Sequence, residues 1–312
     1  MTHVLMTGGA GYLGSTLAPM LLDRGFAVTV VDNFMWDQPS LAGVCHNPAF
    51  TVVRGDVRSK ETMRPLVAKA DIIIPLAARV GAPLCDRDPT AATSTNVEAI
   101  SEMVKVLSPQ QRVLMPITNS GYGIGQKDTF CTEETPIKPI SLYGRNKVDA
   151  ERILLEHHPS SLSFRLATVF GMSPRMRLDL LVNDFTYRAY TDRFIVLFER
   201  HFKRNFIHVR DVARAFLHGI DHFDDMKGQV YNVGLSDANI SKRELCERIQ
   251  QQVPSFVFLE SPIGADPDKR DYIVSNEKIE RTGYRPQVSL DEGIRELLKG
   301  YSMIRNTRYA NV

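Results

Sequence analysis

The sequence predicts an α/β fold in which a doubly wound parallel sheet is followed by a smaller C-terminal region. Short, apolar and mostly β-branched runs alternate with stretches of helical spacing through the first half of the chain. Such alternation is typical of a parallel sheet that carries helices on both faces. After Gly171 this rhythm changes to a stretch rich in arginine, aspartate and aromatic residues. We therefore expect a second, smaller part of the protein beyond this point.

The expected elements follow one another as strand and helix from the N-terminus. Strands are predicted at residues 3–6, 27–31, 50–53, 71–76, 112–117 and 162–169. Helical spacing is present between them at residues 13–24, 59–68, 96–107 and 143–156. Further along the chain, residues 229–233 are expected to return to the main sheet as an additional strand.

These elements predict a main domain at residues 1–171, to which the chain returns at residues 205–235. The smaller region is then formed by residues 172–204 and 236–312. A chain of 312 residues can bury a large core and hold one large domain or two smaller ones. We find no internal repeat, no low-complexity segment and no linker long enough to separate the two parts.

The composition excludes several classes of function. Thirty-eight basic and 36 acidic residues leave a formal net charge of +2, so nucleic acid is not predicted as a partner. The four cysteines are widely spaced without a C-x-x-C pair, and no histidines have zinc-binding spacing, so we expect neither disulfides nor a metal site. No stretch approaches the roughly 20 apolar residues of a membrane helix, and the N-terminus lacks a basic leader. A reduced, cytoplasmic protein without a membrane segment is expected.

The segment TGGAGYLG, residues 7–14, directly follows the first predicted strand and leads into a helix. Gly8, Gly11 and Gly14 have the spacing G-x-x-G-x-x-G. The missing side chains allow the backbone to turn tightly, to approach a pyrophosphate closely and to pack the helix on the strand. The N-terminus of that helix then attracts the anion. The pattern predicts a Rossmann-like dinucleotide site.

Acidic and small residues at the ends of the next strands support this prediction. Asp32 lies 18 residues beyond Gly14, where a carboxylate accepts hydrogen bonds from an adenosine ribose. This carboxylate would repel a 2′-phosphate, and no arginine follows within the next few residues, so NAD is favoured over NADP. Asp56-Val57 and the LAA segment at residues 76–78 suit a surface that lies against the adenine and passes under the pyrophosphate.

A tyrosine and a lysine begin the fourth predicted helix. Tyr143 and Lys147 are four residues apart and therefore share one helical face. A tyrosine ordinarily has a pKa near 10, so it needs help to act as a general base at neutral pH. A neighbouring ammonium favours the ionised phenol, and we expect Lys147 to lower the pKa of Tyr143.

Taken together, these motifs resemble the extended short-chain dehydrogenase/reductase family of nucleotide-sugar epimerases, dehydratases and reductases. The later marks are RNFIHVRD at residues 204–211, YNVG at residues 231–234, and Arg270 a few residues before SNEK at 275–278. The resemblance covers nearly the whole chain. It implies NAD as cofactor, a nucleotide-diphosphate sugar as substrate, a C-terminal region that binds this substrate, and a homodimer.

The resemblance also implies the roles of individual residues. In this family the catalytic Ser or Thr stands five residues before the glycine of a YG dipeptide, and this places Thr118 with Tyr143 and Lys147 in the catalytic group. Apart from Tyr143 and Lys147, the implied cofactor-binding residues are Gly8, Gly11, Tyr12, Leu13, Gly14, Asp32, Asn33, Asp56, Val57, Leu76, Ala77 and Ala78. The implied substrate-binding residues are Ser120, Asn183, Arg204 and Arg270.

The two residues after Thr118 bear on the reaction. Family 4,6-dehydratases place Asp-Glu there, because the elimination of water needs an acid and a base. Sugar-acid decarboxylases keep a glutamate at the second position, whereas 3,5-epimerases and some reductases have a cysteine. This chain has Asn119 and Ser120 instead. A Ser or Thr at the second position is what the C4-epimerases show, so epimerisation at C4 is the favoured reaction.

Three alternatives stay open. A dehydratase could draw its acid from an unusual position such as Asp86, Glu98 or Asp179. A keto-reductase or dehydrogenase would perform only half of the redox cycle and release a changed cofactor. A non-catalytic NAD-sensing protein would keep the glycine loop, although such relatives usually lose the tyrosine or the lysine.

Four further residues have open roles at this stage. Arg175 and Arg177 could recognise an acidic or phosphorylated sugar, or they could belong to a solvated loop. Cys85 is expected to be a small buried thiol rather than an acid/base catalyst. Thr168 stands where many relatives of the family have an asparagine, which puts that sugar contact in doubt.

Overall fold

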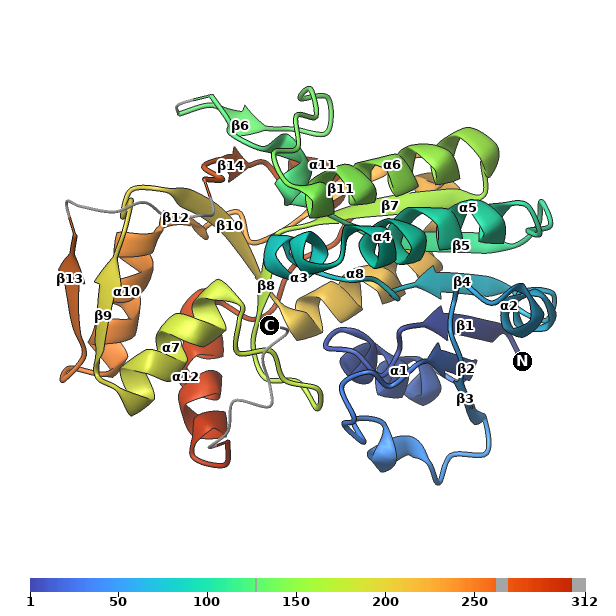
Figure 1. The fold of residues 1–312 in the computed structure, drawn as a ribbon, viewed down its shortest axis with the longest axis horizontal. Coiled ribbons are helices and arrows are strands. Elements are labelled where there is room, and N and C mark those ends of the chain that lie inside the picture. The colour runs from blue at the N-terminus through green and yellow to red at the C-terminus, as the bar shows by residue number, and fades with distance from the viewer. Residues whose placement is uncertain (127, 262–268, 305–312) are drawn as a thin grey trace.

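The computed structural model describes residues 1–126, 128–261 and 269–304. Its centre is a seven-stranded sheet with the order β11-β7-β5-β4-β1-β2-β3, and every neighbouring pair is parallel (Figure 1). The strands are β1 (His3–Thr7), β2 (Ala27–Asp32), β3 (Phe50–Arg54), β4 (Ile72–Pro75), β5 (Arg112–Thr118), β7 (Ser161–Leu166) and β11 (Val230–Val233).

Helices cover both faces of this sheet. One face carries α1 (Gly14–Asp23), α8 (Val209–Asp221), α9 (Phe223–Met226) and α11 (Glu277–Arg281). The other face carries α2 (Lys60–Val67), α5 (Ala99–Val104) and α6 (Leu142–His157). Short helical segments connect these layers: η1 (Ala42–Val44), α3 (Ala82–Arg87), α4 (Pro89–Thr93), the π-helical η2 (Ser94–Glu98) and the 3₁₀ turn η3 (Asn119–Tyr122).

The C-terminal region is built around a second hydrophobic core. It contains the parallel pair β13-β9 and the three-stranded sheet β12-β10-β8, so it also takes in residues 168–170 and 205–208, which the predicted boundaries assigned to the main domain. The strands are β8 (Thr168–Phe170), β9 (Phe194–Leu197), β10 (Lys203–His208), β12 (Asn239–Ser241) and β13 (Val257–Glu260). The helices are α7 (Leu181–Thr191), α10 (Lys242–Gln252) and α12 (Leu290–Tyr301), and they pack through Val182, Leu245 and Ile294. A short pair joins β6 (Phe130–Cys131) to β14 (Ile273–Val274).

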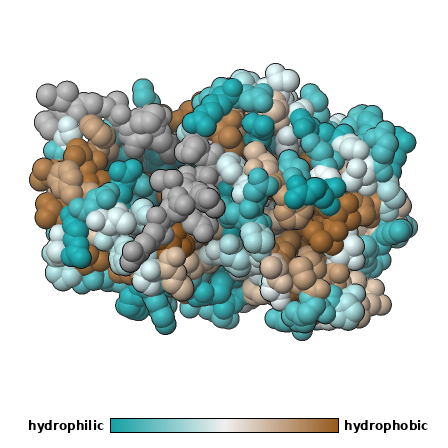
Figure 2. Space-filling view, turned by 60° about the horizontal axis from the view of Figure 1, so that its bottom comes forward, coloured by the Kyte–Doolittle hydropathy of each residue, from teal (hydrophilic) through white to brown (hydrophobic). Residues whose placement is uncertain are grey.

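The β13-β9 pair leaves one apolar face uncovered. Phe194 and Val196 of β9 are 42% and 40% exposed, and their register partners Val257 and Leu259 of β13 are 50% and 54% exposed. The alternate residue Ile195 points inward to the core, as the period of two along a strand requires. Figure 2 shows hydrophobic surface at the left end of the molecule, the end at which β9 and β13 stand in Figure 1.

The predicted strands and helices of the main sheet are confirmed, with one difference. The run at residues 162–169 is not a single strand, because β7 ends at Leu166 and β8 begins at Thr168. β7 pairs with β5 and β11, whereas β8 pairs with β10 of the C-terminal region. The apolar run is continuous because both halves are largely buried, and the sequence alone does not show that it changes sheets. The run predicted at residues 229–233 returns to the main sheet as β11.

Among the helices in the described ranges, none is both long enough and apolar enough to cross a lipid bilayer.

Candidate active site

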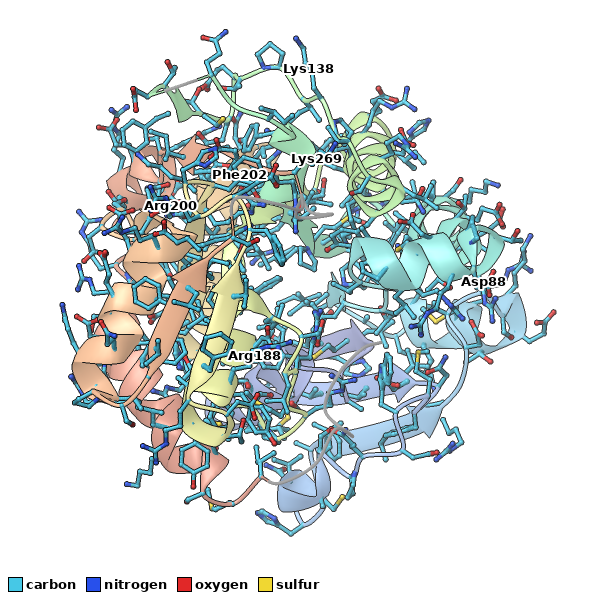
Figure 3. The ribbon with its side chains drawn as sticks, turned by 60° about the vertical axis from the view of Figure 1, so that its left-hand side comes forward. Asp88, Lys138, Arg188, Arg200, Phe202 and Lys269 are labelled. Atoms are coloured by element: carbon cyan, nitrogen blue, oxygen red, sulfur yellow. The ribbon has the colours of Figure 1, made fainter. Side chains whose placement is uncertain are left out.

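A cavity of about 1080 Å³ lies between the carboxyl ends of the main strands and the C-terminal region. Its lining joins the glycine loop, the end of β5, the start of α6 and residues of the C-terminal region. Figure 3 shows the side chains on both sides of this space, with the labelled Lys269 among the residues that line it. Ligands of open α/β sheets bind at this edge, so the cavity is the candidate active site.

The glycine loop has the close contacts that its pattern predicts. Gly8 has a φ of +66°, and a Cβ at this position would lie 2.6 Å from the backbone N and Cα of Ala77. A Cβ on Gly14 would lie 2.5 Å from Cα of Gly9. No side chain caps the first turn of α1, and no acidic residue lies there, so the positive end of the helix can attract an anion.

Asp32 ends β2 and lines the cavity. Its two carboxylate oxygens accept hydrogen bonds from the backbone N–H groups of Ala10 at 3.0 Å and Phe34 at 2.8 Å. Burial raises the pKa of Asp32, and these hydrogen bonds with the charges of Arg175 and Arg54 oppose the rise. The oriented carboxylate keeps lone pairs for further donors, which suits the hydroxyls of a ribose.

The other predicted cofactor residues line the same cavity. They are Gly11, Tyr12, Leu13, Asn33, Asp56, Val57, Leu76, Ala77 and Ala78, together with Tyr143 and Lys147. The Asp56 carboxylate pairs with Arg58 at 2.6 Å, and this hydrogen-bonded pairing lowers the pKa of Asp56. This cavity therefore fits a dinucleotide, because it combines a glycine turn without room for Cβ atoms, a helix start without a side-chain cap and the carboxylate of Asp32.

The predicted catalytic residues also meet in this cavity. Thr118 ends β5, and its Oγ1 donates to Ser120 Oγ at 2.9 Å. Tyr143 and Lys147 come from the first turns of α6, which begins after Ser141, whose hydroxyl accepts a hydrogen bond from Gly144 N–H at 3.1 Å. Thr118 is close enough to the phenol of Tyr143 to influence its pKa. Strand β5 and helix α6 therefore bring a threonine hydroxyl and a phenol together, with the ammonium of Lys147 lining the same cavity.

The acid–base properties of this pair differ from the prediction. Burial raises the pKa of Tyr143 to about 12, although the charges of Arg177 and Arg270 and the hydrogen bond with Thr118 oppose the rise. Burial also lowers the pKa of Lys147 to about 8. The expectation that Lys147 lowers the pKa of Tyr143 is wrong for the protein alone. The physical reason is that desolvation disfavours the charged form of both groups, and the charges that oppose it at Tyr143 are those of Arg177 and Arg270.

Arginine and lysine side chains gather on the substrate side of the cavity. Arg204 of β10 is 3% exposed and lies over the ring of Tyr272, 5.5 Å from its centroid. Arg270 donates a hydrogen bond to Ser120 Oγ, so two predicted substrate residues are in contact. Lys242 also lines the cavity and donates to the carbonyl oxygen of Phe198 at 3.0 Å. No motif surrounds Lys242, so the sequence gives no signal for it.

Asn183 does not line the cavity. Its Oδ1 accepts a hydrogen bond from Gly171 N–H at 3.0 Å, and its Nδ2 donates to the carbonyl oxygen of Arg177 at 2.8 Å. The next residue, Asp184, lines the cavity instead and pairs with Arg188 at 2.9 Å. Successive residues of a helix point about 100° apart, so a shift of one residue along α7 exchanges a buried side chain for one that faces the cavity.

The segment that carries Arg175 and Arg177 is anchored on the glycine-loop helix. Ser173 Oγ donates to the carbonyl oxygen of Tyr12 at 2.7 Å, and Arg175 N–H donates to Ser15 Oγ at 3.3 Å. Arg175 is 2% exposed and Arg177 is 9% exposed, and both line the cavity. The segment is therefore part of the site rather than a solvated loop.

Cys85 lies close to the cavity but does not line it. Cys85 is buried, its Sγ donates to the carbonyl oxygen of Arg79 at 3.3 Å, and burial raises its pKa to about 11. This environment is that of an inert thiol, as expected. The part of the chain that the structure describes holds no group of three or more His, Cys, Asp or Glu residues placed to bind a metal ion.

Comparison with known proteins extends this description. The chain is 28% identical to UDP-glucuronic acid decarboxylase 1 of Arabidopsis thaliana over 96% of its length and 69% of that protein. It is 26% identical to UDP-glucuronate 4-epimerase 5 of the same plant, over 96% of its length and 75% of that protein. A crystal structure of UDP-glucose 4-epimerase with UDP-glucose from Thermotoga maritima superposes with a TM-score of 0.84 at 22% identity, over 97% and 99% of the two chains.

A family model decides the assignment. Residues 4–234, which include the glycine loop and the Tyr143–Lys147 pair, match the model of the NAD-dependent epimerase/dehydratase family. This stretch spans all seven strands of the main sheet. The chain belongs to the NAD-dependent epimerase/dehydratase family.

Proposed function

We propose that the protein is a nucleotide-sugar epimerase that inverts the configuration at C4 of its substrate. The observation that carries this proposal is the set of groups at the end of β5. Thr118, Ser120, Tyr143 and Lys147 line one cavity with the glycine loop, and the two residues after Thr118 carry no carboxylate. Epimerisation needs a reversible oxidation and no elimination, so these groups suffice for it.

The proposed roles follow from where each side chain lies. Tyr143 takes the proton of the C4 hydroxyl as the hydrogen on C4 leaves as hydride, and it returns a proton when hydride is delivered to the opposite face. Thr118, which lines the cavity beside Tyr143, would orient the same hydroxyl. Lys147 would hold the ribose hydroxyls of the dinucleotide. NAD, when bound, would supply the hydride acceptor and donor, and the positive charge of its oxidised ring would favour the ionised form of Tyr143.

Arg204 and Arg270 are proposed to hold the substrate diphosphate, because a guanidinium can donate two parallel hydrogen bonds to phosphate oxygens. Both line the cavity, and Arg270 reaches Ser120 next to the reacting centre. Ser120 is proposed to contact the sugar. Asn183 is buried and donates hydrogen bonds to Tyr12 of the glycine loop and to the carbonyl oxygen of Arg177. We therefore propose that Asn183 positions Arg177 for substrate binding and does not contact the substrate itself.

A dehydratase or decarboxylase is the second candidate. The relatives include decarboxylases, and Asp86 and Asp179 both line the cavity. Asp179 is held in an ion pair with Arg177, at 2.5 Å, which favours a structural carboxylate over a mobile proton carrier. Glu98, the third position considered, is exposed and lies outside the cavity lining.

A panel of nucleotide sugars tests the proposal. The purified protein is incubated with UDP-, GDP-, CDP- and dTDP-sugars, with UDP-glucuronate and UDP-glucose first because the named relatives act on UDP-sugars. We expect an isomer of unchanged mass, with inverted C4 by NMR and no net formation of NADH. Loss of water or of carbon dioxide supports the second candidate, and a change of two hydrogens supports a reductase or dehydrogenase. Tyr143→Phe is the inactive control.

A cytoplasmic homodimer completes the proposal. The resemblance supports a dimer in which α5 and α6 pair with the same helices of a second copy, and these two helices pack side by side on one face of the sheet (Figure 1). Light scattering of the purified protein would show twice the chain mass of 35.1 kDa. A monomer at all concentrations would contradict this part of the proposal without affecting the reaction.

A further inference from the structure

A buried ion pair lies behind the candidate catalytic lysine. Glu151 is about one helical turn beyond Lys147 on α6 and is 4% exposed. Arg165 of β7 donates to both carboxylate oxygens of Glu151, at 2.7, 3.2 and 3.3 Å. Ser163 Oγ donates to the same carboxylate at 2.5 Å. β7 therefore holds this carboxylate in one position, and its pairing with a guanidinium favours the ionised form.

Glu151 is aligned with the catalytic pair. Tyr143, Lys147 and Glu151 follow one another at intervals of four residues, so they lie along one face of α6. Burial lowers the pKa of Lys147, and the charge of Glu151 is the main influence that opposes this effect. The helix thus places a buried negative charge one turn beyond Lys147, whereas Tyr143 lies one turn before it.

The elements packed around α6 carry other titratable groups. They are Cys85 and Asp86 of α3, Glu98 of η2, Glu102 of α5, Tyr122 of η3 and Arg165 of β7. The thiol and the phenols keep their protons, because burial raises their pKa values. Asp86 and Glu98 are exposed, and Glu102 pairs with two surface lysines. Within the described ranges, Glu151 is the carboxylate that acts on Lys147.

Folding stability alone does not explain why an ion pair is buried in the protein interior. Burying two charges costs desolvation free energy that their attraction often fails to recover, and apolar residues of similar size can replace such pairs without loss of stability. Here Glu151 of the pair lies one helical turn from Lys147, a buried lysine that the proposed function requires as a cation. Arg165 balances the carboxylate and is also close enough to Tyr122 to donate to its hydroxyl at 3.2 Å.

We propose that Glu151 is a positioning residue that holds Lys147 in its charged form beneath the dinucleotide, and that Arg165 moderates this attraction. The inference rests on the proposed function, since that function requires Lys147 as a cation at the ribose. Glu151 touches neither substrate nor cofactor in this scheme, because it lies outside the cavity lining. It acts only through the ammonium.

The test measures the ionisation of Lys147 directly. Lysine labelled with ¹³C at Cε is incorporated, the Lys147 signal is assigned by its loss in Lys147→Arg, and its shift is followed against pH in the protein without added ligands. In Glu151→Gln we expect the pKa of Lys147 to fall by about one unit or more, because the attraction is lost while the Arg165 charge stays. An unchanged pKa in Glu151→Gln overturns the proposal.

Two further variants separate charge from packing. Ser163→Ala removes a hydrogen bond to the same buried carboxylate but keeps its charge, so the pKa of Lys147 should move much less than in Glu151→Gln. The double variant Glu151→Gln/Arg165→Met removes both charges. It leaves no unpaired arginine in the interior, so it can be measured even if Glu151→Gln alone folds poorly. We expect the pKa of Lys147 in this double variant to lie between those of the single variant and the unchanged protein. Equal values in Ser163→Ala and Glu151→Gln would contradict the proposal.

The turnover measurement distinguishes this inference from the proposed function. In Glu151→Gln the fall of kcat at high pH should begin about one pH unit lower than in the unchanged protein, in line with the titration of Lys147. If Lys147 titrates as expected but no nucleotide sugar is turned over, the proposed function fails while the charge coupling stands. If turnover is found but its pH profile is the same in both proteins, the positioning role fails.

Discussion

The guanidinium of Arg175 lies over the ring of Trp36, 4.6 Å from its centroid, although 139 residues separate the two in the chain. Both side chains line the cavity next to Asp32. Arg175 comes from the segment that is anchored on α1, whereas Trp36 follows β2, so the contact joins the C-terminal region to the side of the cavity that Asp32 lines. It also brings a positive charge to Asp32, which the local sequence around Asp32 lacks.

This contact makes dinucleotide binding measurable. Trp36 is the single tryptophan of the chain, so we expect its fluorescence to change when NAD binds. Arg175→Ala should weaken NAD binding by about tenfold, because it removes a cation–π contact and a charge from the site. Arg281→Ala, on the exposed surface of α11, is the matched control and should leave the titration unchanged. Equal affinities in the two variants would show that Arg175 does not contribute.

Tyr143→Phe should reduce turnover by about 10²- to 10⁴-fold, because the variant loses the group that transfers the proton. NAD binding, followed by Trp36 fluorescence, should persist, since the ring itself is retained. Tyr190→Phe changes an exposed tyrosine of α7 in the same way and should leave turnover unaltered. Substantial activity of Tyr143→Phe would mean that another group is the base.

Arg177 should set the pH at which the enzyme becomes active. Of the groups that oppose the effect of burial on the pKa of Tyr143, Arg177 has the largest influence. Its replacement by Met raises this pKa further, so a smaller fraction of the phenol is ionised at any given pH. We expect turnover of Arg177→Met to fall at neutral pH, because the rising limb of its pH profile moves to higher pH while the fall that follows the titration of Lys147 stays in place. Arg152→Met, on the exposed side of α6, should keep the original profile of kcat/KM against pH.

Glu296 should contribute to stability in a pH-dependent way. Burial acts to raise the pKa of Glu296, but hydrogen bonds and charge from His208 and Arg210 outweigh burial and bring the pKa to about 2. The ordinary pKa of glutamate is about 4.3, so this stabilisation is present above that pH and is lost as the pH falls toward about 2. Glu296→Gln should lower the free energy of unfolding by about 2 kcal/mol at neutral pH and flatten its acid dependence. Denaturant unfolding measures both, and exposed Glu277→Gln is the control.

Gly8→Ala should impair both folding and NAD binding. Its Cβ would lie 2.6 Å from the backbone of Ala77, and the φ of +66° is strained for any other residue. Gly43→Ala adds the same methyl group where no atom lies within 4 Å, so it should be neutral. Thermal unfolding and Trp36 fluorescence titration give the two readouts. A Gly8→Ala protein with normal stability and affinity would show that the close approach is not required.

Local sequence patterns were sufficient to predict the strands and helices of the main sheet and two of the motifs. The period of apolar residues predicted the strands of the main sheet, because alternation and helical spacing follow from backbone geometry within a few residues. The glycine spacing predicted contacts that a Cβ at Gly8 or Gly14 would block. The four-residue interval between Tyr143 and Lys147 placed both in the cavity, since helix geometry alone decides which residues share a face.

Other features depended on segments that meet only in the folded chain. The side of α7 that faces the cavity exposes Asp184 and not Asn183, because the packing of the helix sets its rotation. The ionisation of Tyr143 was predicted with the wrong sign, since burial is a property of the whole site. The pair of Glu151 with Arg165 joins α6 to β7, and neither residue carries a sequence signal for the other.

The sequence by itself therefore determined the order of strands and helices, the glycine turn and the spacing of the catalytic pair, all of which depend on neighbours within about one helical turn or one strand. Only the tertiary structure decided which charges face one another and how far water is removed from them. Desolvation and long-range Coulomb interactions depend on distances in space between residues far apart in the chain, and these distances exist only once the sheet and the C-terminal region have packed together.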